Sequence, residues 1–244
     1  MSERSSRQLA RSAPVPLLLS TLIVLALLGI GWYAPTESTM GHVQRIVYMH
    51  VAVAWFGLWG LIATAVCGLL YLLRRQLDWD HWAQAFAELG WLCAGLTLVT
   101  GSMWARAAWG TWWTWEPRLT TAFILWCIYG GYLIARHNVE DASRRARLSA
   151  ILAIAGALDV PLVILATRLF RGMHPVSPTM EPAMRSVLWL SIVSFTAFFC
   201  WLTAHRKTQL RQHEQLTNLE SQRARRSDEA APEPLLKYVR QIDA

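Results

Sequence analysis

Residues 46–73 read IVYMHVAVAWFGLWGLIATAVCGLLYLL and contain no Asp, Glu, Lys or Arg, although Arg45 and Arg74 flank the run directly. A helix needs about 20 apolar residues to cross the roughly 30 Å hydrocarbon core of a bilayer. This run exceeds that length. It therefore predicts a helix that spans a membrane.

Five other runs without these four residue types are long enough, once flanking aromatic residues are counted, to cross a bilayer. They cover residues 12–36, 89–105, 119–135, 148–167 (interrupted only by Asp159) and 186–205. A cleaved signal peptide is an alternative for the first run, but its apolar stretch exceeds a typical signal-peptide core and no A-x-A-like site follows it. We expect an all-α, polytopic integral membrane protein with six transmembrane helices.

The composition supports this class and excludes others. The 244 residues are 54% hydrophobic and 16% charged, whereas soluble domains are about 25% charged. The formal net charge is +7, but the basic residues punctuate long uncharged runs, so we expect no nucleic-acid partner. Because Cys67, Cys93, Cys127 and Cys200 stand singly, without a CxxC pair, we expect no disulfide framework, zinc ribbon or covalent c-type haem attachment.

The distribution of Lys and Arg predicts the orientation. Six helices place both termini on one side, together with the loops 74–82 and 136–147, and that side holds most of the 23 basic residues. By the positive-inside rule this side is cytoplasmic. We divide the chain into a cytoplasmic segment 1–14, a transmembrane domain 15–205 and a partly disordered cytoplasmic tail 206–244. The outer loops are then 34–45, 106–118 and 168–185.

The middle outer loop is rich in tryptophan: five of the 14 in the chain lie within residues 104–115. Trp109, Trp112, Trp113 and Glu116 have the i, i+3, i+4, i+7 spacing of one helical face, and Pro117 would end such a turn. We expect a short amphipathic segment that lies on the outer surface and presents a shelf of indole rings. An aromatic belt at the membrane interface is the alternative.

Two histidines flank this segment, His50 near the outer end of the second span and His174 in the last outer loop. Neutral imidazole binds transition metals and supplies axial ligands to haem iron. A flat macrocycle on the indole shelf, ligated by both histidines, would use all these features, with Arg45 and Arg118 available for carboxylates. Each histidine could instead be structural, His42 is a possible substitute ligand, and Arg106, Arg168 and Arg185 are interpreted as interfacial anchors.

Two further predictions concern polar residues elsewhere. Asp159 lies within the fifth span, where a carboxyl group is either functional or a hydrogen-bonded part of a helix kinked by Pro161. The residue types alone favour neither account. The remaining histidines are expected to be cytoplasmic and solvated: His81, His137, His205 and His213.

The segment 109–120, WGTWWTWEPRLT, closely resembles the tryptophan-rich signature of the CcmC, or haem exporter protein C, family of cytochrome c maturation proteins. YMHVAVAW at 48–55 and EPAMRS at 181–186 add to the resemblance, which covers about residues 15–205. The family commonly has Asp where this chain has Glu116. The segment before His174 lacks the Trp-Trp and Asn-Thr-Leu expected there.

The resemblance implies a multi-pass protein of the bacterial inner membrane that binds haem b on the periplasmic side and is not an enzyme. It implies delivery of haem to the membrane-anchored chaperone CcmE, beside an ABC-type complex of CcmA, CcmB and CcmD. The implied site consists of axial ligands His50 and His174, the indoles of Trp109, Trp112, Trp113 and Trp115, and the charged residues Arg45, Arg118 and Glu116. Alternatives are a b-type electron-transfer cytochrome and a small-solute transporter.

Overall fold

A computed structural model describes residues 14–170 and 180–230, and within these ranges every regular element is helical. Two elements are short: a π-helical η1 (Gly29–Tyr33) and a 3-10 helix η2 (His42–Gln44). The longer helices are α2 (Pro14–Leu28), α3 (Arg45–Arg74), α4 (Leu77–Trp109), α5 (Pro117–His137), α6 (Ala142–Ala157), α7 (Val160–Leu169) and α8 (Pro182–Ala230).

Six helical stretches of the described chain are long and apolar enough to cross a membrane. They are Pro14–Tyr33, His42–Arg74, Leu77–Trp109, Pro117–His137, Ala142–Ala166 and Pro182–Ser227. The predicted all-α class and the count of six spans are therefore confirmed.

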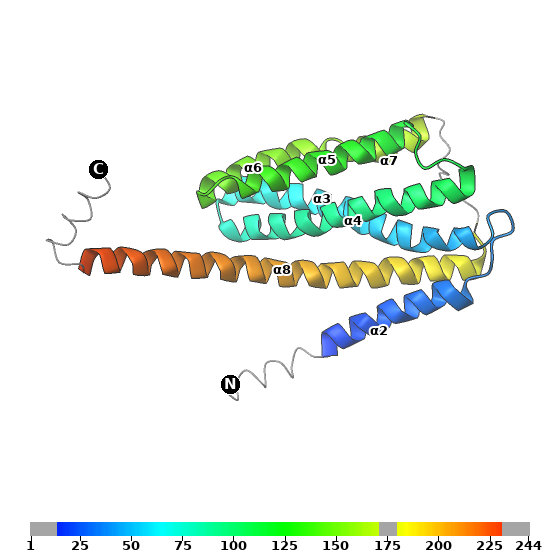
Figure 1. The fold of residues 1–244 in the computed structure, drawn as a ribbon, viewed down its shortest axis with the longest axis horizontal. Helices are drawn as coiled ribbons and strands as arrows, with labels where there is room; N and C mark the ends of the chain where they lie inside the picture. Colours follow the sequence, from blue (N-terminus) through cyan, green and yellow to red (C-terminus); the bar gives the residue numbers. More distant parts are fainter. Residues whose placement is uncertain (1–13, 171–179, 231–244) are drawn as a thin grey trace.

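The spans form a bundle in which α3 is central. It packs against α4, α6 and α8, while α5 packs against α4, α6 and α7. Figure 1 shows α8 running along the bundle and continuing well beyond it, with α2 on the outer side of α8. The N-terminus of α2 and the C-terminus of α8 lie toward the same end of the bundle.

Small residues allow α3 and α4 to approach closely. A Cβ atom added at Gly57 would lie 3.0 Å from the backbone nitrogen of Ala94, and one at Gly60 would lie 3.3 Å from Cα of Gly90. Without a hydrophobic driving force between helices in lipid, such close packing is a main source of helix association in membranes. The register of α3 against α4 is thereby fixed.

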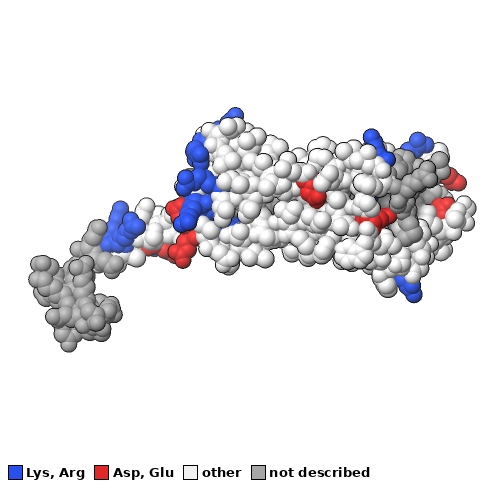
Figure 2. Space-filling model, turned by 90° about the horizontal axis from the view of Figure 1, so that it is seen from above, with Lys and Arg blue, Asp and Glu red and all other residues white. Residues whose placement is uncertain are grey.

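The loops that carry many of the charged residues are shorter than predicted. The expected loops 74–82 and 136–147 are wrong, because α4 already begins at Leu77 and only residues 138–141 separate α5 from α6. Acidic residues enter the start of α4 because each has a partner: Asp80 pairs with Arg136, and Glu88 with Arg206. Figure 2 shows Lys and Arg gathered at the two ends of the bundle, with the surface between almost free of them.

His81 is not solvated as expected. It is 8% exposed, and its Nε2 lies 2.8 Å from a carboxylate oxygen of Glu214 in α8. His137, His205 and His213 are exposed, as predicted. The pairing of His81 could not be read from the sequence because Glu214 lies on a different helix, far along the chain.

The fifth span is broken beside Asp159, as the kinked-helix alternative expects. α6 ends at Ala157 and α7 begins at Val160, with Asp159 as its N-cap residue and Pro161 in its first turn. Asp159 is 9% exposed, and its Oδ2 atom has no hydrogen-bond partner among the described residues. The break is thus present, while the role of this carboxyl group stays a prediction.

Candidate functional site

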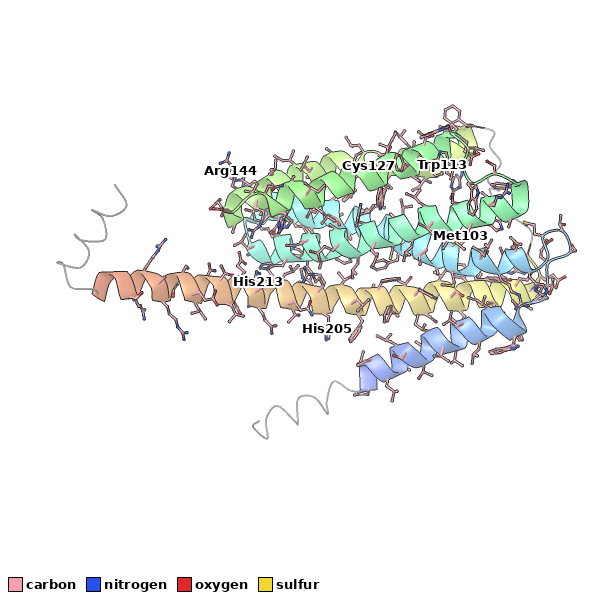
Figure 3. All side chains as sticks on the ribbon, in the orientation of Figure 1. Met103, Trp113, Cys127, Arg144, His205 and His213 are labelled. Carbon is pink, nitrogen blue, oxygen red and sulfur yellow. The ribbon has the colours of Figure 1, made fainter. Side chains whose placement is uncertain are left out.

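A cavity of about 140 Å³ lies between α3, α4 and α5 at the end of the bundle where α5 begins. Its floor is apolar and includes Leu61, Leu125 and Val163. Its outer wall contains the residues predicted from sequence: His50, Trp109, Trp112, Trp113, Glu116 and Arg118. Figure 3 places Trp113 at this end and Arg144 at the opposite end of the bundle. Three helices and one loop therefore bring six of the nine predicted site residues to one cavity.

The tryptophan-rich loop is not a helix. α4 ends at Trp109, Gly110 adopts a left-handed conformation with φ 76°, and residues 110–116 are irregular. Glycine takes this conformation without steric cost and commonly ends helices. The predicted amphipathic helix is therefore wrong, and so is the role given to Pro117, which begins α5 rather than ending a turn.

The loop is nevertheless held against α4 by hydrogen bonds. Ser102 Oγ donates to the carbonyl of Trp112 at 2.5 Å, and the Arg106 guanidinium donates to the carbonyl of Gly110. Sequence reasoning missed both positions and interpreted Arg106 as an interfacial anchor. The available signal was their spacing: Ser102, Arg106 and Trp109 follow at i, i+4 and i+7 on one face of the helix.

The indoles divide into two groups. Trp109 and Trp113 line the cavity and are partly buried, and Trp109 packs edge-on against buried Trp104 with ring centroids 4.8 Å apart. Trp112 also lines the cavity but is 59% exposed. Trp115 is 75% exposed and packs against Trp113 outside the cavity lining. The structure therefore brings three of the four predicted indoles to the cavity.

Polar groups also reach the cavity. The indole N–H of Trp113 is buried and has no hydrogen-bond acceptor among the described residues. Arg118, in the first turn of α5, interacts electrostatically with Glu116. A guanidinium group can bind a carboxylate through two parallel hydrogen bonds. The wall could therefore accept an anionic group beside an apolar floor.

His50 is positioned by α4. Its Nδ1 atom lies 3.0 Å from Thr100 Oγ1, and its Cε1 atom lies 3.0 Å from where a Cβ atom of Gly101 would be. Sequence reasoning identified His50 but neither of these neighbours.

Three other predicted residues are placed differently or lie outside the described chain. The Arg45 guanidinium donates to the carbonyls of Gly31 and Ala34, joining η1 to the start of α3, and does not line the cavity. His42 is exposed in η2. His174 lies outside the described residues, so its proposed role as a ligand stays a prediction.

A sequence model of the heme exporter protein C family matches residues 2–224. The chain belongs to the heme exporter protein C family. The resemblance seen in the tryptophan-rich segment is thereby confirmed over almost the whole chain.

Curated relatives agree with this assignment. The heme exporter protein C of Escherichia coli K12 is 30% identical over 203 residues, which cover 80% of this chain and 82% of that protein. The heme exporter protein C of Bradyrhizobium diazoefficiens is 33% identical over 211 residues, covering 81% and 79% of the two chains. A ccmC-like mitochondrial protein of Marchantia polymorpha, described as a putative cytochrome c biosynthesis protein, is 32% identical over 146 residues, covering 60% and 61%.

Membership in the heme exporter protein C family, together with six membrane-spanning helices, identifies a multi-pass membrane component of haem transport in cytochrome c biogenesis. Such a component carries a cofactor and is not an enzyme.

Proposed function

We propose that this protein binds haem b at the cavity beside the tryptophan-rich loop and delivers it to the chaperone CcmE during cytochrome c maturation. One observation carries the proposal: α3, the end of α4 and the start of α5 bring an imidazole, indole rings and a guanidinium group to the same cavity. Family membership supports haem as the ligand.

The residues present fit a porphyrin with carboxylate side arms. Indole rings offer broad apolar faces with a polar N–H edge, and the buried N–H of Trp113 lacks an acceptor in the described chain. Arg118 and this N–H would bind propionates, with Glu116 close to Arg118. Arg45 was predicted for the same purpose, but its contacts with Gly31 and Ala34 favour a role in joining η1 to α3.

His50 would supply one axial ligand to the iron and His174 the other. Two imidazole ligands leave no open coordination position, which suits transport more than oxygen chemistry. The protein's part is to hold and orient the cofactor, and to release it when a ligand or the loop moves.

The size of the cavity bears on release. At about 140 Å³ it is smaller than the roughly 300–1,000 Å³ of most small-molecule sites, so a porphyrin would enter it only in part. The exposed indoles of Trp112, at the cavity, and of Trp115, packed against Trp113, would cover part of the remainder. A cofactor held at an edge in this way stays accessible to a chaperone.

The orientation and partners follow from charge and from the family. The basic residues of the opposite end and of the tail 206–244 would face the cytoplasm, and the cavity would then lie on the periplasmic side of the inner membrane. Nothing in the sequence resembles a nucleotide-binding P-loop. ATP hydrolysis would therefore come from the ABC-type partners CcmA and CcmB, with CcmD as a small subunit.

The test is the absorption spectrum of the detergent-purified protein, oxidised and reduced, for the wild type, His50→Ala, His174→Ala and the control His42→Ala. We expect a low-spin b-type spectrum that the first two substitutions convert to high-spin or abolish and that His42→Ala leaves unchanged. Stopped-flow mixing with purified CcmE should then show transfer of haem.

Other results would contradict the proposal. A wild type that stays free of haem after reconstitution would favour the small-solute transporter. Reversible redox cycling with a quinol, without transfer to CcmE, would favour a b-type cytochrome. Unchanged spectra for His50→Ala would remove this residue from the ligand set.

A further inference from the structure

The imidazole of His50 lies against α4, beside Thr100 and Gly101. Its Nδ1 atom lies 3.0 Å from Thr100 Oγ1. The other hydrogen bonds of the hydroxyl determine which of these two atoms donates.

A hydroxyl group has one proton and can accept through its lone pairs. Thr100 Oγ1 lies 2.7 Å from the carbonyl of Leu96 and 3.3 Å from that of Thr97, both in its own helix. Donation from threonine to the carbonyl four residues earlier is common in helices. Its proton is therefore committed to Leu96, and the hydroxyl can only accept from His50. The proton of the neutral imidazole must then be on Nδ1.

Gly101 makes this geometry possible. A Cβ atom at this position would lie 3.0 Å from His50 Cε1 and 3.6 Å from Nδ1, so any side chain would push the ring away from α4 by a few tenths of an ångström. The ring can approach Thr100 to hydrogen-bond distance only because residue 101 has no side chain.

We infer that Thr100 and Gly101 are positioning residues that fix the Nδ1–H tautomer of His50 and so present the lone pair of Nε2 to haem iron. The link to iron rests on the proposed function, whereas the tautomer itself does not. Neutral imidazole with its second nitrogen hydrogen-bonded is the usual state of a metal-ligating histidine.

The chemical nature of the acceptor affects how strongly His50 would bind iron. Metal-bound histidines often donate to a carboxylate, which raises the basicity of the ligand. Thr100 offers a neutral hydroxyl instead, so the imidazole remains a weaker donor to iron. A ligand oriented firmly but bound moderately suits a protein that must give its haem away.

The tautomer can be tested without haem. We would record ¹⁵N spectra of the histidine-labelled, haem-free protein and assign His50 by its loss in His50→Gln. We expect the Nδ1–H pattern in the wild type and a mixture of tautomers in Thr100→Val. The control is Thr97→Val, because Thr97 lines the same cavity but its hydroxyl donates to Cys93 of its own helix. An Nε2–H pattern in the wild type would overturn the inference.

The second test measures haem itself. Loss of such a supporting contact costs about 10–100-fold in metal affinity, so Thr100→Val should raise the haem dissociation constant by that factor and shift the midpoint potential. Thr100→Ser should restore both, and Gly101→Ala should weaken binding. Thr121→Val should match the wild type, because Thr121 lies outside the cavity lining and its hydroxyl donates to the carbonyl of Pro117 in its own helix. Thermal unfolding of each variant reports whether it is folded.

The outcomes separate the two proposals. A wild type that binds no haem refutes the proposed function, and the ¹⁵N pattern still decides the tautomer. A wild type that binds haem, beside a folded Thr100→Val with unchanged affinity and potential, refutes the positioning role alone.

Discussion

Replacing Asp80 by Asn should destabilise the protein strongly, because it leaves a buried positive charge without its partner. Arg136 and Asp80 are 4% and 3% exposed. Their side chains meet through two parallel hydrogen bonds, with Nη1 2.7 Å from Oδ1 and Nη2 2.5 Å from Oδ2. Arg136 Nε also donates to Gln84 at 2.9 Å. Asn keeps the shape of the carboxylate but removes the charge and one acceptor.

The expected magnitude follows from burial. Breaking a buried ion pair by removing one partner costs about 3–5 kcal/mol. An exposed pair contributes only about 0–1 kcal/mol, and the pair of Lys207 with Asp78 is of this kind, since Asp78 is 49% exposed. A chain of this size loses about 2–4 °C of melting temperature per kcal/mol. Asp80→Asn should therefore lower the melting temperature by about 6–20 °C, and Asp78→Asn by about 4 °C at most.

The assay is thermal unfolding in detergent, followed by tryptophan fluorescence. A third variant, Asp80→Leu with Arg136→Met, removes both charges and should recover most of the lost stability, because an apolar replacement of a buried pair is often neutral or better. The reasoning would be refuted if Asp80→Asn cost no more than Asp78→Asn, or if the double variant were as unstable as the single one.

Three further substitutions test packing and pH dependence. Gly156→Ala places a Cβ atom 2.8 Å from Cγ2 of Ile128 and should cost about 1–3 kcal/mol of stability. Gly131→Ala is the control: a Cβ atom there has nothing within 4 Å, so the change should be neutral or stabilise the protein by up to about 1 kcal/mol. Thermal unfolding of the two variants measures the difference. The pKa of Glu37 is lowered below its ordinary value of 4.5, chiefly because the backbone N–H of Met40 donates to its carboxylate. The order that this contact gives to the loop around Met40 should be present above about pH 4.5 and lost as pH falls through the lowered pKa. The protection factor of the Met40 amide, which is its exchange rate relative to that of an unstructured amide at the same pH, should therefore fall in acid, and in Glu37→Gln it should not change with pH.

The number of spans could be predicted because the cost of burying charge in a bilayer is local to each run of residues. The ends of the spans could not. The acids at the start of α4 look like the edge of a soluble loop until Arg136 and Arg206, on other helices, are seen to pair with them. Sequence distance hides such partners.

The sequence predicted which residues belong to the candidate site better than it predicted how they are arranged. Helical spacing grouped Trp109, Trp113 and Glu116, and the structure groups them too, but through an irregular loop that begins at Gly110. No motif or spacing in the sequence marks Thr100 as part of the site. Its contact with His50 depends on the register of α3 against α4, which the close approach of small residues determines.

The length of α8 has a mechanical consequence. Its 49 residues measure about 74 Å at 1.5 Å per residue, whereas the bilayer core takes up roughly 30 Å. No proline or glycine follows Pro182 in this helix, so it lacks the residues at which helices usually kink. It therefore forms one stiff rod, with one end at the cavity end of the bundle and the other well beyond the opposite end. Polar contacts of α8 with Asp78, His81 and Glu88 of α4 hold this rod to the bundle near the end where it emerges.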